Sequence, residues 1–563
     1  MKKRNLKRSF VILLLCFSAA AAMQLYVPPD DPVYGFLDRL ETRGINRDLL
    51  NDIRPMLRDD IVKALLKAKE AETQLPYAER ELLDYYLSEY RRELSELPHP
   101  LLIQGADTLD SYFGILRKGG IGREVKGLFS DRPGQERRHM YIYEDNGNTV
   151  WLDIGTVLRG EGKNEKLRAV NYYTGEIAVQ AGENMALYID GALFYQLKRD
   201  GFNEPAKEFA GYWYNDYEYE HLITYDRSRA YANLTGKFGT LSLSHYPMNW
   251  GNGKHSLIIS QDAIEFGALQ WTKEFKYFKY TFLHGSLMTS DFSWSEEEGR
   301  HYTPKYLVAH RAEGRFGSLL HMSISEMLVY GNRIPEPTYL VPVILLWPSE
   351  HALGDRDNKL IAIDAELFPI NGLKLYGTFF LDEFSPTHFF EDWWANKYAV
   401  QAGMYWAPRK APMDLRVEWT AVHPWTYAHR YPFASYTHHG KGLGFVYGPN
   451  TRLLTADINW DLTGRHRLSL QYKRLLEGAD EIELGGIWYP SGGDPEQNYE
   501  ERARELDDAT GWLTGEFIRR TNSLAFSWYY RWRNQISFLT GCELRNVDGN
   551  NQAYYSLQIR LHY

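Results

Sequence analysis

The chain has 563 residues, 44% hydrophobic and 24% charged, so it can bury a large core, and wholesale disorder is excluded. Mean hydropathy is −0.47, and beyond the N-terminus no apolar run approaches the ~20 residues of a membrane helix, which excludes a polytopic helical membrane protein. The net charge of −9 argues against a nucleic-acid partner, because binding to phosphates rewards basic surface.

Residues 1–22 have the form of a secretory signal peptide. Five basic residues come first, an apolar stretch follows from Phe10 to Phe17, and Ala20 to Ala22 supply small side chains for cleavage. A membrane anchor is the alternative, but the stretch is too short to span a bilayer. Cleavage would change the net charge from −9 to −14, because five basic and no acidic residues leave. Cys542 would then be the one cysteine, so no internal disulfide is expected.

Residues 23–100 have the apolar spacing of helices, and we expect them to form a helical domain in the periplasm. The aspartate pair at 30–31 can cap a first helix that ends near Gly44, and the pair at 59–60 can cap a second. A third helix is predicted from about Tyr77 to Leu94, with apolar residues on one face. Such stripes ordinarily form only the core of a small bundle.

From about residue 138 the apolar period changes from 3.6 to 2, which is typical of strands. Apolar and polar residues alternate over 413–422, 453–462 and 523–530, and segments of this kind recur to the end of the chain. Turns rich in Gly, Asn, Asp and Pro separate them. The last strand is apolar at every second position and ends on an aromatic residue, Tyr563.

A soluble β-sandwich also alternates, but two features favour a transmembrane barrel. The segments are ~10 residues long, which is what a tilted strand needs to cross a bilayer, whereas soluble strands average ~5–6. Aromatic residues, 15% of the chain, recur on the apolar face and near strand ends, as interfacial girdles require. Residues 101–563 are therefore predicted to form a closed antiparallel outer-membrane β-barrel of about 18 strands, and the fold class is mainly β.

Counting strands leaves a problem of parity near the C-terminus. Predicted short turns at 463–466, 519–522, 531–534 and 547–550 would leave the last residue outside the cell, although it should lie in the periplasm. An additional strand at Glu481–Tyr489 would restore an even count.

Signals for enzymatic chemistry are missing from the sequence. It contains no GxSxG, HExxH, CxxC or Walker-type motif. Asp355, Asp357 and Asn358 are close enough in sequence to touch Ca²⁺, but they lack an EF-hand loop and are interpreted as a turn rich in Asx residues. We therefore predict a protein that is not an enzyme and has neither a cofactor nor a metal site.

Several unusual segments occur in a characteristic order. They are a WGxG-like segment followed by SLxxS at 250–260, a GDxDN turn at 354–358, an LYGxFxxDE strand at 375–383, and a YxHxGxxLG segment followed by GPN at 436–450. Together with Tyr34–Leu37 and the Arg-Pro pair at 54–55 in the N-terminal region, this order resembles the Wzi family of capsule-assembly outer-membrane proteins. The resemblance extends from about residue 30 to 563, with a departure at Asn252, where the family tends to have proline.

The resemblance implies a barrel of about 18 strands with a periplasmic helical bundle and a lectin-like role without catalysis. The implied partners are capsular or other surface polysaccharide, outer-membrane lipid and lipopolysaccharide, and the barrel-assembly machinery, and the protein is expected to be a monomer. Aromatic faces bind sugar CH groups, and carboxylates, amides and imidazoles bind hydroxyls. The glycan-binding candidates are Trp250, Asn252, His255, Trp347, His351, Asp355, Trp393, Trp394, Trp425, His438 and His439.

Two other functions remain open. A porin for small solutes or oligosaccharides would have the same barrel with a wet lumen, and a barrel hydrolase would need an activated nucleophile. Each candidate aromatic residue also has an ordinary interpretation as part of an interfacial girdle or of loop packing. The helical region and the long aromatic loops favour a plugged barrel over an open one.

Overall fold

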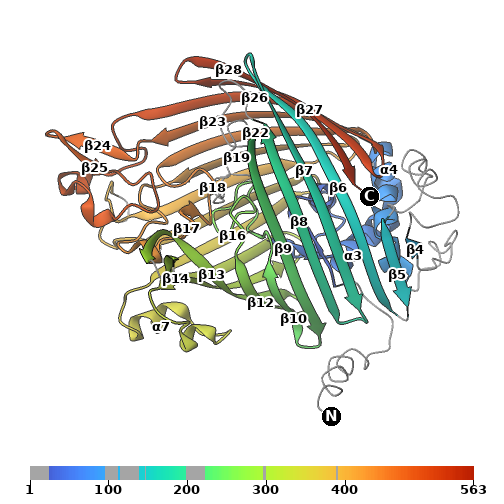
Figure 1. Ribbon diagram of the computed structural model, residues 1–563, viewed down its shortest axis with the longest axis horizontal. Coiled ribbons are helices and arrows are strands. Elements are labelled where there is room, and N and C mark those ends of the chain that lie inside the picture. The colour runs from blue at the N-terminus through green and yellow to red at the C-terminus, as the bar shows by residue number, and fades with distance from the viewer. Residues whose placement is uncertain are drawn as a thin grey trace, which may run out of the picture.

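The computed structural model describes residues 24–95, 112–113, 139–145, 147–197, 222–295, 299–388 and 391–562. Within them the chain forms a closed barrel in which eighteen antiparallel strands follow one another and β28 pairs with β6 to complete the ring (Figure 1). The predicted fold class and strand number are confirmed. The predicted signal peptide, residues 1–22, lies outside the described residues.

The barrel strands are long, as a tilted crossing of a membrane requires. Their bounds are β6 Asn148–Lys163, β7 Lys166–Ala181, β8 Met185–Leu197, β9 Leu222–Gly236, β10 Gly239–His245, β12 Gly267–Glu274, β13 Phe278–Ser295, β14 Gly299–Phe316, β15 Leu320–Gly331, β16 Asn358–Ile370, β17 Leu373–Glu383, β18 Lys397–Trp406, β19 Met413–Val422, β22 Thr451–Thr463, β23 His466–Gly478, β26 Ile518–Arg533, β27 Ile536–Val547 and β28 Asn550–His562.

Short strands complete the sheet pairings. Strand β5 (Tyr141–Asp145) pairs with the first residues of β6, on the edge that β28 covers further along, and β4 (Tyr112–Phe113) pairs with β5. The remaining pairs are β1 with β3, β2 with β11, β20 with β21, and β24 with β25. Their bounds are β1 Tyr26–Val27, β2 Ile53–Arg54, β3 Met56–Leu57, β11 Asn249–Trp250, β20 Thr437–His438, β21 Lys441–Gly442, β24 Glu481–Leu484 and β25 Ile487–Pro490.

The problem of parity in the predicted strand count comes from one incorrectly predicted turn. Residues 519–522 lie inside β26, which runs without a break from Ile518 to Arg533. The predicted strand at Glu481–Tyr489 is wrong as a barrel strand, because β24 and β25 form a separate hairpin. With one turn fewer, the last strand ends at the end of the barrel that carries the short turns.

The two ends of the barrel differ. Short turns join the strands at one end, where the helices also lie, and long connections with α7, β24 and β25 lie at the other (Figure 1). Outer-membrane barrels have short periplasmic turns and longer extracellular loops. We call the helical end the inner end, and the end with the long connections the outer end.

The helical segment begins with α2 and ends with α5. Asp31 caps α2 through a 2.8 Å hydrogen bond from the Val33 amide, as expected. Leu57, and not an aspartate, is the N-cap of α3. Asp59 and Asp60 lie in the first turn of α3, where their negative charges interact favourably with the helix dipole. The third predicted helix divides in two near Tyr90. The bounds are α2 Pro32–Thr42, α3 Arg58–Glu70, α4 Tyr77–Glu89 and α5 Arg91–Ser95, and no described helix is long and apolar enough to cross a membrane.

Ion pairs fix the helical segment in the inner mouth of the barrel. The Arg39 side chain is 1% exposed and pairs with Glu79 of α4 and with Asp414 and Asp461 of the wall. Lys374 of β17 binds Glu41 of α2 at 3.0 Å. The charged residues that alternate with apolar ones in the strands therefore point inward and hold this segment, while the apolar alternates point outward.

A hydrophobic core fills the middle of the barrel. The connection between β10 and β12, residues 246–266, enters the lumen, where Trp250 is fully buried and pairs with Ile53 of β2. Tyr427, Tyr436 and other residues of the β19–β22 connection pack into the same core, against inward-facing side chains of the wall. The core members from the wall are Ala268, Leu283, Leu287, Leu307, Ala309, Met327, Val329, Leu360, Ala362, Phe380, Ala399, Val422, Leu453 and Leu475.

Candidate functional site

The outer half of the wall contains a notch between β9 and β13. The two strands between them, β10 and β12, are only 7 and 8 residues long, and their outermost pair is His245 with Gly267. Beyond that pair, residues 222–229 of β9 and 287–295 of β13 have no barrel strand between them in the described part of the chain. The notch exposes two sheet edges and allows an outer connection to reach the wall.

The hairpin of β20 and β21 occupies part of this notch. The amide of Met288, on the β13 edge, donates to Nδ1 of His438 at 2.9 Å, and the amide of His439 donates to the Met288 carbonyl at 2.9 Å. Deeper in the wall, the ammonium group of buried Lys305 donates to the hydroxyls of Ser435 and Thr437. The position of the hairpin is thus fixed by bonds to two adjacent strands.

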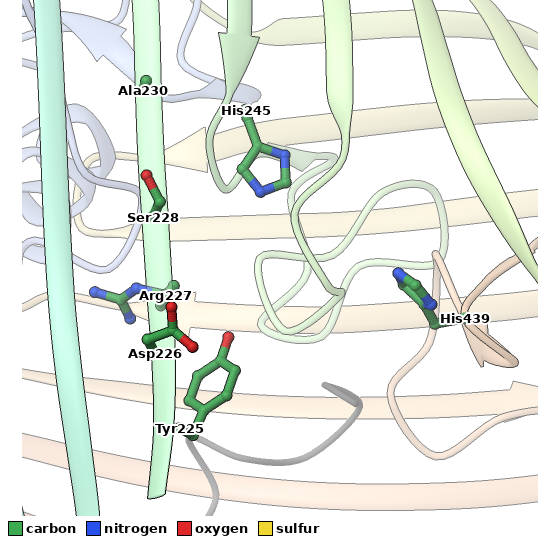
Figure 2. Close-up of a pocket in the computed structure, with 7 residues that line it drawn as sticks. All are labelled: Tyr225, Asp226, Arg227, Ser228, Ala230, His245 and His439. Atoms are coloured by element: carbon green, nitrogen blue, oxygen red, sulfur yellow. The ribbon is translucent and has the colours of Figure 1, made fainter. Parts of the chain in front are cut away.

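A pocket of about 460 Å³ remains between the hairpin and β9, within the size range of small-molecule sites. Its lining is Tyr225, Asp226, Arg227, Ser228, Ala230, His245 and His439. Figure 2 shows β9 along one side of the space, with the phenol of Tyr225 and the two imidazoles directed toward it from three segments. Phenol, carboxylate, guanidinium, hydroxyl and imidazole together match the hydroxyl, carboxylate and CH groups of sugars.

His439 is the pocket residue whose side chain is best placed to hydrogen-bond a ligand. Its φ angle of 50° lies in the left-handed region, where histidine is found more often than most residues other than glycine. Its buried Nδ1 has no hydrogen-bond partner among the described residues. Burial lowers the pKa of His439, so the neutral ring can both donate to and accept from a ligand.

The predicted residues around position 250 do not lie on the outer surface. Trp250 is in the lumen core, and the side-chain amide of Asn252 donates to the carboxylate of Asp52 in the helical segment. His255 is half-buried, 3.5 Å from the Asp262 carboxylate. The interpretation of Trp250 and Asn252 as surface glycan contacts is therefore corrected. Both residues join the outer connection to the N-terminal segment. The apolar SLxxS run that follows carries that connection into the lumen.

The three tryptophans predicted in outer loops are packed against other side chains and do not form a free platform: Trp394 and Trp425 share one cluster, and Trp393 packs separately. Trp425 is 2% exposed and packs with Tyr499, which lies 5.4 Å from Trp394 between ring centroids. Arg502 lies over the Trp394 ring at 3.4 Å. Trp393 is half-buried and stacks on His388. Trp425 is therefore wrong as an exposed contact, and replacing the three together would disrupt the outer connections before it tested glycan binding.

Trp347, His351 and Asp355 lie together on the connection between β15 and β16. Trp347 and His351 are 6.2 Å apart between ring centroids, and Lys359 donates to Asp355 at 2.9 Å. Asp357 is paired with Arg333, so neither carboxylate is left uncompensated. His438 is buried against β13, and among the candidates only its neighbour His439 lines the pocket.

The sequence analysis missed the pocket residues that come from β9 and β10. Asp226, Arg227 and Ser228 follow one another in β9, and a consecutive polar run breaks the alternation expected of a strand in a membrane. That break was the available signal. His245 lies five residues before the segment that the sequence analysis singled out at 250–260, and it stands at the rim of the notch.

Lowering the pH from 7 to 4.5 should loosen the outer connections while the barrel strands stay protected. Burial lowers the pKa of His423 to about 4 and that of His438 to about 3. Because these pKa values lie below that of unfolded histidine, the unfolded state takes up protons first, and stability is lost as the pH falls below ~6.5. The loss reaches about 2–3 kcal/mol per imidazole at pH 4.5. Hydrogen exchange of the amides of residues 423–450 measures this loss of stability. Unchanged protection of these amides at pH 4.5 would contradict the prediction.

Closed strands, inward-facing charges and outward-facing apolar side chains define an outer-membrane β-barrel with a filled lumen. No protein-family model and no curated protein matches the sequence. The fold is similar to that of Wzi from Escherichia coli, described as an outer-membrane protein involved in group 1 capsule assembly and as a carbohydrate-binding β-barrel. The identity is 12%, the match covers 95% of this chain and 99% of that chain, and the TM-score is 0.55.

Two proteins of Pseudomonas aeruginosa, the outer-membrane protein OprD and OpdK, also match over part of the chain. OprD is 10% identical over 73% of this chain and 94% of that chain, with a TM-score of 0.39. OpdK, solved with vanillate, is 8% identical over 74% of this chain and 98% of that chain, with a TM-score of 0.43. At these identities the likeness concerns the fold, so the function has to be argued from the site.

Proposed function

We propose that this protein binds surface polysaccharide, capsular polysaccharide above all, at the outer end of an outer-membrane barrel and does not conduct solutes. The observation that carries the proposal is the filled lumen, combined with a pocket at the outer rim that both polar and aromatic side chains line. The likeness of the fold to a carbohydrate-binding barrel agrees with it.

The lumen is filled in two layers, and this argues against the porin alternative. Buried ion pairs hold the helical segment in the inner mouth, and a buried apolar core that includes Trp250 and Tyr436 fills the middle. A water-filled channel needs a polar lining, but the middle of this barrel is lined by packed leucine, methionine and aromatic side chains. On this proposal the helical segment is the periplasmic domain, and the outer connections present the binding surface.

The pocket has the chemistry for an acidic sugar unit of a polymer. Arg227 lies 3.6 Å from Asp190 and retains donors that can reach a sugar carboxylate. Asp226 and the two imidazoles can bind hydroxyl groups, and the ring of Tyr225 offers an apolar face. Because the pocket opens at the rim, one unit can bind there while the chain continues outside.

A double substitution at the pocket should lower polysaccharide affinity without unfolding the protein. His245→Ala combined with His439→Asn removes both imidazoles, and asparagine tolerates the left-handed backbone at 439. We expect about a tenfold loss, ~1.4 kcal/mol, in binding of acidic capsular polysaccharide to the refolded protein. Lys441→Ala, at an exposed position on the same hairpin, is the matched control. Equal binding by all three proteins would place the glycan elsewhere.

Planar-bilayer recording tests the other half of the proposal. The wild-type protein should show no steady conductance, because both layers of the lumen are packed. Large open-channel steps from correctly folded protein would favour a porin.

A further inference from the structure

The connection between β15 and β16, residues 332–357, lies outside the barrel against its wall. Alternation along the strands settles the side: Leu283, Ala309 and Met327 belong to the lumen core, whereas their neighbours Phe282, Val308 and Leu328 belong to another cluster. That cluster is completed by two residues of this connection, Tyr339 and Leu346. The connection, with the 3₁₀ turn Pro337–Leu340 and helix α7 (Leu346–Ala352), therefore covers the lipid-facing side of β13, β14 and β15 (Figure 1).

Beside this apolar cluster, the wall beneath the connection also carries polar groups that bond to it. The carboxylate of Glu326 accepts from the amides of Leu346 and Trp347 at 3.0 and 2.8 Å. Tyr280 donates its hydroxyl to the carbonyl of Pro342, and the Tyr330 hydroxyl accepts from the amide of Glu336 at 3.2 Å. A carboxylate facing hydrocarbon is costly unless it is paired. The connection supplies the partners and shields these groups.

The face that the connection turns away from the wall is apolar. Residues 337–348 contain no charged side chain and include three prolines, which have no amide hydrogen to satisfy. The exposed apolar side chains are Ile334 (81%), Leu340 (43%), Val341 (44%), Val343 (71%), Leu345 (69%) and Trp347 (36%). This patch continues the lipid-facing side chains of the neighbouring strands, where Ile324 is 52% and Ile363 43% exposed.

We infer that this connection is an interfacial anchor, whose apolar side chains enter the outer leaflet of the membrane at the boundary between headgroups and acyl chains. Its occupant is the lipid of that leaflet, because the patch is uncharged, lies outside the wall and is continuous with the lipid-facing band. Trp347 suits that depth, since tryptophan is enriched at membrane interfaces. Irregular backbone is avoided deeper in hydrocarbon, and here it is bonded to the wall. The inference concerns membrane contact and is independent of the polysaccharide proposal.

Fluorescence quenching in vesicles tests this placement. Val343→Cys is made in a background of Cys16→Ser and Cys542→Ser, labelled with the fluorophore NBD, and reconstituted into dioleoylphosphatidylcholine with or without brominated acyl chains. Ile324→Cys, on the lipid-facing wall, and Ile487→Cys, 57% exposed in the β24–β25 hairpin, are the two references. We expect brominated lipid to quench Val343 as it quenches Ile324, and iodide to quench it several-fold less than Ile487.

Two other outcomes would overturn the inference. Strong quenching by iodide with none by brominated lipid would place the connection in water. Quenching by neither would mean that protein covers the patch, for example a second copy of the chain. Leu345→Cys, at a position 69% exposed, repeats the measurement at a second site on the same face.

Discussion

Replacing Arg39 with methionine is expected to release the helical segment from the inner mouth of the barrel. Arg39 is the shared cation of three buried carboxylates, Glu79, Asp414 and Asp461, and without it they face one another with much less compensation. Removing one partner of a buried ion pair commonly costs ~3–5 kcal/mol, because the remaining charges stay buried. Hydrogen exchange of the α2 amides should report a loss of that size in local opening free energy.

A surface ion pair in the same segment is the matched control. Lys63 pairs with Asp60 at 2.9 Å, and its side chain is 66% exposed. Lys63→Met should change the α2 opening free energy by less than ~1 kcal/mol, as exposed pairs do. If both substitutions have the same small effect, apolar packing and not charge holds the helices in place.

Trp250→Ala should be the most destabilising single change in the lumen core. Trp250 is fully buried between the N-terminal β2 strand and the outer connection, and truncating a buried tryptophan typically costs ~3–5 kcal/mol in transfer and cavity terms. Guanidinium unfolding of the refolded protein in detergent should show a lower midpoint.

Trp347→Ala provides the comparison, because this tryptophan is 36% exposed on the outer face of the wall. Its removal should cost less than ~1 kcal/mol of the same unfolding free energy, as surface substitutions usually do. Equal losses at both positions would mean that the lumen core relaxes around the missing ring.

Much of the architecture was predictable because it depends on local periodicity. The change from period 3.6 to period 2 separated the helical segment from the barrel, and the strand predicted at 413–422 is β19 to the residue. The turn predicted at 519–522 was wrong, because β26 carries two arginines and polar neighbours near its outer end, where a long strand extends beyond the membrane. A local pattern of polar residues cannot distinguish a turn from a strand that continues into water.

The candidate site was less predictable, because it depends on contacts between distant segments. The tryptophans at 250 and 425 have the sequence context of loop aromatics, yet tertiary packing buries both. Contacts of Met288 with residues 438 and 439, and of Lys305 with residues 435 and 437, bring the β20–β21 hairpin to the notch opposite β9. No spacing in the sequence predicts a pocket in which residue 439 joins residues 225 and 245, which lie 214 and 194 positions before it.

The pairing of β11 with β2 has a mechanical consequence. A polymer retained at the cell surface pulls on the outer connections whenever fluid moves past the cell. Here one of those connections is hydrogen-bonded, through the amide of Gly251 and the carbonyl of Asp52, to the segment whose ion pairs hold it in the opposite mouth. On the proposed function, tension applied outside would be shared between the wall and this internal connection, which runs through the barrel to the helical segment at the inner mouth.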